Sequence, residues 1–176
     1  NSAGQIGDGT QTDRLVPTSV DLGTDMTAVA ISSGTGYSCV VLNDGSVKCW
    51  GSNWYGTIGD GTTTNRSSPV TVDLGADMTS VAVFSGSNHS CAVLNNGLVK
   101  CWGDNTYGQI GDETTTDRLS PVTVDLGADM TAVTVSASRS DSCAVLSDGS
   151  VKCWGNNAWT TVQWVVPVAI DLEDSS

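Results

Sequence analysis

The clearest pattern along the chain is an alternation of side chains around a short polar turn in Cys39–Cys49. Side chains alternate between the two faces of a strand, so the cysteines share one face with Val41 and Val47. The turn Asn43–Gly45 suits a type I turn followed by a residue with positive φ, which glycine adopts without strain. The sequence therefore predicts an antiparallel hairpin with Cys39 opposite Cys49 and Val41 opposite Val47.

This hairpin pattern returns twice, at Cys91–Cys101 and Cys143–Cys153, each time 52 residues further along the chain. Between hairpins lie two more short apolar runs, such as Pro69–Leu74 and Val81–Phe84, separated by turn-forming residues. We expect each proline to open its run. No helical period of about 3.6 residues is visible. The pattern predicts an all-β fold with four short antiparallel strands per repeat.

All six cysteines of the chain lie in the three hairpins. Directly opposed residues of an antiparallel pair are about 4.5–5.5 Å apart at Cα, which is within reach of a disulfide. We expect the pairs Cys39–Cys49, Cys91–Cys101 and Cys143–Cys153; three pairs of free buried thiols are the alternative. Because disulfides persist outside the reducing cytosol, they predict an extracellular or cell-surface protein.

A second motif precedes each hairpin at the same spacing. Gly4–Thr10 (GQIGDGT) recurs at Gly56–Thr62 and Gly108–Thr114, and each copy is followed by an arginine three residues before a proline. Together with S-C-A-V-L-x-D-G-x-V-K-C-W-G, this pattern resembles the regulator of chromosome condensation repeat family. The cysteine-bearing form is similar to that of bacterial secreted or surface proteins. The resemblance implies a β-propeller, as a rule seven-bladed, and a role in protein–protein recognition.

The length predicts an incomplete propeller. Seven blades of this period need about 360 residues, and the chain has 176. We therefore expect one repeat domain spanning residues 1–176, built as an open arc of about three and a half repeats. The repeats are expected at 1–52, 53–104 and 105–156, with a degenerate partial repeat at 157–176.

The partial repeat replaces the glycine-rich motif and the arginine with an apolar sequence. Exposed apolar clusters often mark contacts, so we expect this part of the chain to join another copy. The expected interaction residues are Trp159, Val162, Trp164, Val165, Pro167, Val168 and Ile170. We expect residues 167–172 to complete the first blade of a partner copy. Two alternatives are that the segment folds back as a cap, and that the chain is a fragment of a longer propeller.

Charge narrows the choice of partners. The chain carries 19 acidic and 7 basic side chains, for a net charge of −12. Such a surface repels a phosphate backbone, so we expect no nucleic-acid partner. No apolar run approaches the roughly 18 residues needed to span a membrane, and no signal peptide is visible.

Candidate chemistry is sparse. His89 is the only histidine, and we expect it to be a structural hydrogen-bonding residue. The recurring aspartates, such as Asp60, suit turns that bond their own backbone better than the six to eight oxygen ligands of calcium. The recurring arginines, such as Arg66, are expected to pin the glycine-rich loops. We therefore expect no cofactor and no resident metal, with calcium as the weaker alternative.

These observations favour a non-enzymatic extracellular structural or interaction protein whose blades self-associate end to end as a ring or filament. The alternative is a module of a secreted propeller that binds another protein, as an inhibitor or adhesin does. In that case Trp54, Tyr55, Tyr107 and Trp159 are the natural anchors.

Overall fold

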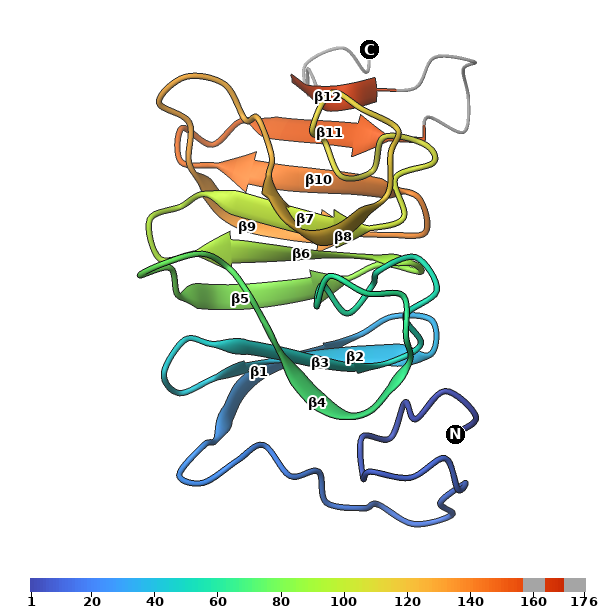
Figure 1. Cartoon of the computed structure of the whole chain (residues 1–176). Coiled ribbons are helices and arrows are strands. Elements are labelled where there is room, and N and C mark those ends of the chain that lie inside the picture. Colours follow the sequence, from blue (N-terminus) through green and yellow to red (C-terminus); the bar gives the residue numbers. More distant parts are fainter. Residues whose placement is uncertain (157–163, 170–176) are drawn as a thin grey trace.

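In the computed structural model, which describes residues 1–156 and 164–169, twelve strands form three four-stranded antiparallel sheets. Each sheet is called a blade below. Figure 1 shows the blades stacked one on the next, with the first residues and β12 at opposite ends of the stack. The expected all-β architecture of an open propeller arc is confirmed, and the described residues form no closed ring.

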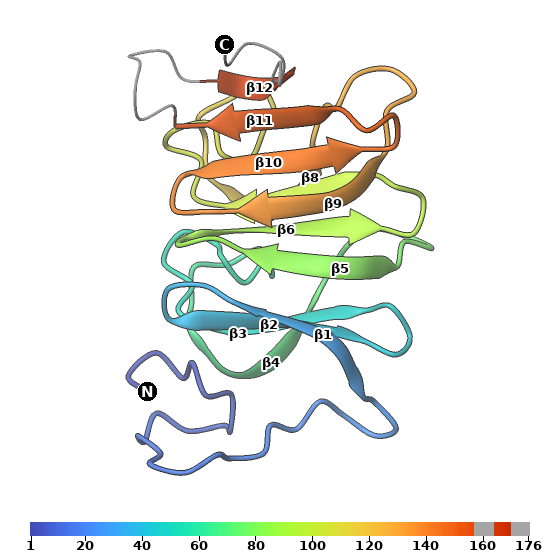
Figure 2. The same ribbon diagram turned by 180° about the vertical axis from the view of Figure 1, so that it is seen from behind.

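Each blade has its strands in chain order. The first contains β1 (Ala28–Ser33), β2 (Tyr37–Leu42), β3 (Val47–Gly51) and β4 (Arg66–Val72). The second contains β5 (Ser80–Ser85), β6 (His89–Leu94), β7 (Val99–Gly103) and β8 (Arg118–Thr123). The third contains β9 (Ala132–Ala137), β10 (Asp141–Leu146), β11 (Val151–Gly155) and β12 (Trp164–Ala169). The view from behind shows the first strands β1, β5 and β9 following one another along the stack (Figure 2).

The central hairpins have the expected register. Cys39 pairs with Cys49 and Val41 with Val47, and Gly45 takes a φ of 79° in the turn. All three expected disulfides are present: Cys39–Cys49, Cys91–Cys101 and Cys143–Cys153.

The outer strands differ from expectation in where they begin. β4 and β8 start at Arg66 and Arg118, three residues before the prolines that we expected to open them. Pro69 is tolerated inside β4 because this strand lies at the edge of its sheet, where a missing N–H removes no ladder bond on the open side. The first and second blades thus take their outer strands from beyond the glycine-rich loop that follows their hairpins.

The first proline run is not a strand. Residues 14–20 align with β4 and β8 at the 52-residue period, but no described strand pairs with them. This corrects the expectation that each proline opens a strand, because the segment at Pro17 has no neighbouring strand to satisfy its backbone hydrogen bonds.

The last proline run also departs from expectation. β12 pairs with β11 of its own chain, with Lys152 opposite Ala169 and Cys153 opposite Val168. This pairing corrects the expectation that the segment completes the first blade of another copy, and it agrees with the alternative in which the segment folds back onto its own blade.

The core lies between the blades. Each blade has a leading face, turned toward the first residues of the chain, and a trailing face, turned the other way. In the first blade, Val40 and Leu42 lie on the leading face, and Cys39 and Val41 lie on the trailing face. The trailing face of the first blade packs on the leading face of the second, where Ala92 and other residues complete one buried cluster. A second cluster of the same kind joins the second and third blades.

Candidate interaction surfaces

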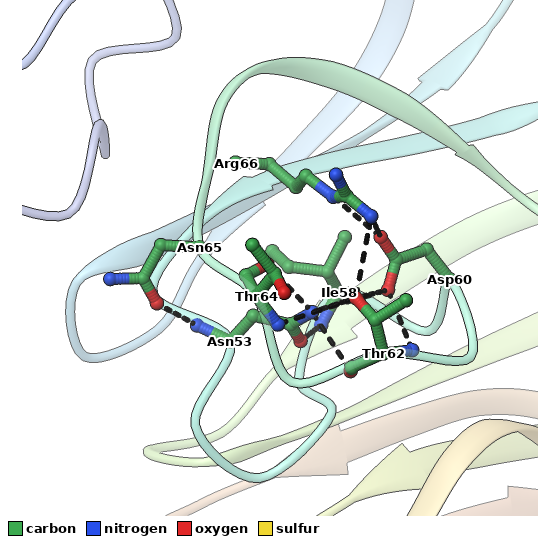
Figure 3. Close-up of polar contacts among 7 residues, drawn as sticks. All are labelled: Asn53, Ile58, Asp60, Thr62, Thr64, Asn65 and Arg66. Atoms are coloured by element: carbon green, nitrogen blue, oxygen red, sulfur yellow. Dashed lines mark hydrogen bonds and ion pairs between the residues drawn. The ribbon is translucent and has the colours of Figure 1, made fainter.

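A polar clamp shapes each glycine-rich loop, and Figure 3 shows the copy around Asp60. One carboxylate oxygen of Asp60 accepts hydrogen bonds from the Thr62 amide and hydroxyl at 3.0 and 2.7 Å. The other accepts from Nε of Arg66 at 2.6 Å. Asn53 closes the loop by accepting the Ile58 amide at 2.9 Å and donating to Asp60 at 3.2 Å. Both oxygens of Asp60 are therefore used within the loop.

The electrostatics of the clamp stabilise the ionised carboxylate. Burial acts to raise the pKa of Asp60, but the hydroxyl of Thr62 and the guanidinium of Arg66 outweigh it, so this pKa lies below its ordinary value. Ion pairs of the same kind join Asp8 to Arg14 and Asp112 to Arg118. Since the carboxylates are already paired, the clamp supports a structural role for the recurring arginines and aspartates. Within the described ranges, no group of three or more His, Cys, Asp or Glu side chains is placed to hold a metal ion.

The clamped loop connects neighbouring blades. Ile58 is fully buried between the first and second blades. The adjacent carbonyl of Thr57 accepts hydrogen bonds from the Trp102 indole at 2.9 Å and from the Ser90 hydroxyl at 3.1 Å. Gly59 has a φ of 78°, and a Cβ there would lie 2.7 Å from the Trp102 ring. One contact between blades thus accounts for the recurrence of Ile58, Gly59 and Trp102 in the repeat. The sequence did not predict this contact.

A polar chain crosses the buried faces at Tyr37 and His89. Between the first and second blades, the Ser90 hydroxyl lies 3.0 Å from the Tyr37 hydroxyl. One blade further, Nε2 of His89 lies 2.9 Å from the Ser142 hydroxyl, which itself donates to the Gln109 carbonyl at 3.0 Å. Because the single hydroxyl hydrogen is directed to Gln109, Nε2 of His89 carries a proton and donates it to Ser142.

Burial lowers the pKa of His89 to about 4, although Asp104 and Asp141 act to raise it. Its Nδ1 is buried and has no hydrogen-bond partner among the described residues. A histidine held neutral between two sheets fits the expected structural role.

The two ends of the stack expose what the middle buries. Val41 and Val93 are buried on the trailing faces of the first and second blades, whereas their counterpart Val145 on the third blade is 37% exposed. At the other end, Ile31 on the leading face of the first blade is 67% exposed, whereas its counterpart Val83 is buried. The third disulfide is likewise half-buried, whereas the first two are fully buried. Each end therefore presents one half of an interface between blades, which the described residues cover only in part.

The first residues cover only part of the leading face. Val20, Leu22 and Met26 pack against Val40, Leu42 and Trp50. Leu15 and Val16, by contrast, are 100% and 70% exposed in the unpaired segment 14–20.

The expected interaction residues divide into two groups. Trp164, Val165, Pro167 and Val168 lie in β12, where Pro167 is buried. Trp159, Val162 and Ile170 lie outside the described residues. Among the expected aromatic anchors, Trp54, Tyr55 and Tyr107 are exposed, and Trp159 again lies outside the described part.

These features define a class of protein: an open segment of a β-propeller whose blades are joined by clamped loops. The family model of the Regulator of chromosome condensation (RCC1) repeat matches residues 44–93 and 96–145. A second family model of the same repeat matches residues 28–57 and 81–109. The chain belongs to the RCC1 repeat family.

Two relatives illustrate the range of the family. The E3 ubiquitin-protein ligase HERC2 of Homo sapiens is 32% identical over 129 residues, which cover 72% of this chain and 3% of that protein. The Ultraviolet-B receptor UVR8 of Arabidopsis thaliana is 33% identical over 118 residues, which cover 67% of this chain and 27% of that protein. The chain thus spans less than a third of either relative.

Solved structures agree on the fold. The crystal structure of human WBSCR16 has a TM-score of 0.84 at 22% identity, covering 97% of this chain and 45% of that one. Yeast RCC1 (Prp20), in its crystal structure with Kap60, has a TM-score of 0.74 at 16% identity, covering 84% of this chain and 38% of that one. Across residues 1–156 and 164–169, no helix combines the length and hydrophobicity needed to cross a membrane.

Proposed function

We propose that this chain is a non-enzymatic interaction protein whose propeller arcs join end to end in an extracellular setting, as a ring or a filament. The observation that carries the proposal is the half-interface at each end of the stack, which the described residues leave partly exposed at Val145 and Ile31. The two halves are complementary. Inside the chain, the trailing face of one blade packs on the leading face of the next, and the two ends of the stack present one face of each kind.

The complementarity extends to individual residues. Val41 and Val83 belong to one buried cluster between blades, and Val93 and Val135 belong to the next. At the same 52-residue steps, the next pair is Val145 of one copy and Ile31 of another. Burial of both side chains would remove exposed apolar surface from water, which favours association.

A polar pair continues in the same way. Tyr37 contacts Ser90, and His89 contacts Ser142. At the next 52-residue step, the Asp141 carboxylate of one copy would lie beside the Ser38 hydroxyl of another. The hydroxyl can then donate a hydrogen bond to the carboxylate. The copies therefore match in both apolar and polar character.

The disulfides support the proposed setting. Three of them suggest an oxidising, extracellular environment. We place the chain with the secreted or surface bacterial form of the repeat because each cysteine hairpin ends in Cys–Trp–Gly. Intact-mass mapping of the natural polypeptide, with and without reduction, tests this placement.

Light scattering over a concentration series tests the association, at about 0.15 M salt because the charge of −12 causes repulsion at low ionic strength. We expect the average mass to rise with concentration, and the variants Val145→Asp and Ile31→Asp to abolish the rise. Val81→Asp is the matched control, because Val81 is 58% exposed although its blade is in the middle of the stack. A strict monomer at high concentration, or equal effects of all three variants, would refute the proposal.

A second candidate is recognition of another protein through the loop aromatics. Trp54 is 75% exposed and borders a shallow hollow with Gln11, Thr63, Thr64 and Asn65. Exposed aromatic anchors are typical of binding hot spots. If this candidate is right, Trp54→Ala weakens binding to a partner protein and leaves the scattering mass of the chain unchanged.

A further inference from the structure

The outer strand of each blade occupies a slot beside the third strand. In the first blade, Gly51 is opposite Arg66 and Cys49 is opposite Val70. In the second, Gly103 is opposite Arg118 by the same register. In both blades the arginine at the start of the outer strand is bound to the aspartate of the preceding loop. The slot thus takes a strand that is anchored at its first residue by an ion pair.

The third blade fills this slot without the anchor. Trp164 stands opposite Gly155, where the other two blades have arginine. Among the residues that the structure describes, no ion pair holds β12 in place. Its ladder with β11 is otherwise in the same register as in the other blades. β12 therefore has the hydrogen bonds of an outer strand and lacks the charged clamp.

The segment Arg14–Val20 has the opposite combination. Arg14 is bound to Asp8 and lies within 3.4 Å of the Thr10 hydroxyl, as its counterparts are in the other clamps. The loop before it is docked on the first blade, since the Trp50 indole donates to the Gln5 carbonyl at 3.0 Å. No described strand pairs with the segment, and Leu15 is fully exposed. The segment thus has the ion-pair anchor of an outer strand but no third strand to pair with among the described residues.

We propose that residues Arg14–Val20 of a second copy replace β12 on β11, which makes the joint between copies a strand exchange. This inference rests on the proposed end-to-end association and specifies its mechanism. By the register of the other blades, Arg14 would lie opposite Gly155, Thr18 opposite Cys153, and Ser19 opposite Lys152. Backbone pairing gives such a joint a defined register, which face packing alone does not.

The exchange also completes the buried face of the third blade. The loop Gly4–Thr10 of the second copy would cover Val145 and the Cys143–Cys153 disulfide, as the loop around Ile58 covers the trailing face of the first blade. Ile6 is half-buried in the single chain and would become buried as Ile58 is. Each joint then continues the 52-residue period, so an assembly contains a multiple of three blades.

Cysteine cross-linking between two differently tagged chains tests the register. One chain carries Ser19→Cys and the other carries Lys152→Cys, so a mixed disulfide can form only between copies. The matched control replaces the second chain with Lys100→Cys, because Lys100 occupies the same place in β7 and, like Lys152, donates to a backbone carbonyl. At ~10 μM chain we expect mixed disulfides to form on the order of 100-fold faster with Lys152→Cys, since docked thiols reach millimolar effective concentrations. Equal rates with both chains would overturn the proposal.

An engineered disulfide that holds β12 on β11 distinguishes strand exchange from other modes of association. The double variant Lys152→Cys and Ala169→Cys places two cysteines at opposed positions of β11 and β12. Lys152→Ser with Ala169→Ser is its unlocked control, and peptide mapping verifies the pairing. We expect the locked chain to remain monomeric at concentrations where the control and the native chain associate.

The outcomes of the lock are distinct. If the locked chain associates as well as its control, strand exchange is wrong and end-to-end packing of the blade faces stands. If the native chain itself is monomeric, the proposed association fails and the exchange fails with it.

Discussion

Acid should destabilise this protein through its single histidine. His89 is buried between the second and third blades, and its pKa is lowered from 6.5 to about 4. Because the unfolded chain binds a proton at a higher pH than the folded chain does, stability is complete above pH 6.5 and is lost as the pH falls toward 4. Between pH 7 and pH 5 the expected loss is about 2 kcal/mol, from 1.36 kcal/mol per pKa unit.

The physical cause of this loss is visible in the hydrogen bonds. Nε2 of His89 already donates to Ser142, so the added proton must go to Nδ1, which has no acceptor within the described residues. A charge would therefore be buried between two sheets without a partner.

Urea unfolding at pH 7 and pH 5 measures the effect, with His89→Tyr as the control. Tyrosine occupies the equivalent place at Tyr37, over Gly34, just as His89 lies over Gly86. We expect the variant to lose little stability over this pH range, since no other side chain of the sequence has its ordinary pKa there. An equal loss in both chains, or no loss in the native chain, would refute this account of His89.

Further predictions concern the loops, the disulfides and metals. Ile58→Ala should lower the unfolding free energy by about 2–4 kcal/mol because the side chain is fully buried. Ile6→Ala should lower it by less because Ile6 is half-buried. Equal urea midpoints for the two variants would contradict this. The Cys143–Cys153 disulfide is half-exposed and should be reduced before the other two, which timed alkylation and mass mapping would detect; simultaneous reduction would argue against an open third blade. Asp60→Asn should cost about 1–2 kcal/mol through loss of the ion pair with Arg66, seen as a lower melting temperature than that of the native chain. Chelation with EDTA should leave the melting temperature unchanged, and a fall would reveal a bound cation.

The local parts of the fold follow from the sequence. The register of Cys39 with Cys49 depends on residues only ten apart, and the alternation of side chains and the glycine of the turn define it. The three disulfides and the four-stranded pattern follow from the same local rules. The period of 52 residues then extends one prediction to three blades.

The non-local parts could not be predicted. Arg66 was expected to pin the glycine-rich loop, but its partner Asp60 was not, because the ion pair forms only when the loop closes back on itself. The bond from Trp102 to the Thr57 carbonyl joins residues 45 apart, and alternation within strands carries no information on such contacts. The unpaired state of residues 14–20 is also non-local, because a strand needs a neighbour that its own sequence does not specify.

Electron microscopy of the purified chain at micromolar concentration is the most direct test of end-to-end joining. The account predicts rings or filaments in which blades follow one another without a break and number a multiple of three. A field of separate three-bladed particles that never join, at any concentration that remains soluble, would contradict it.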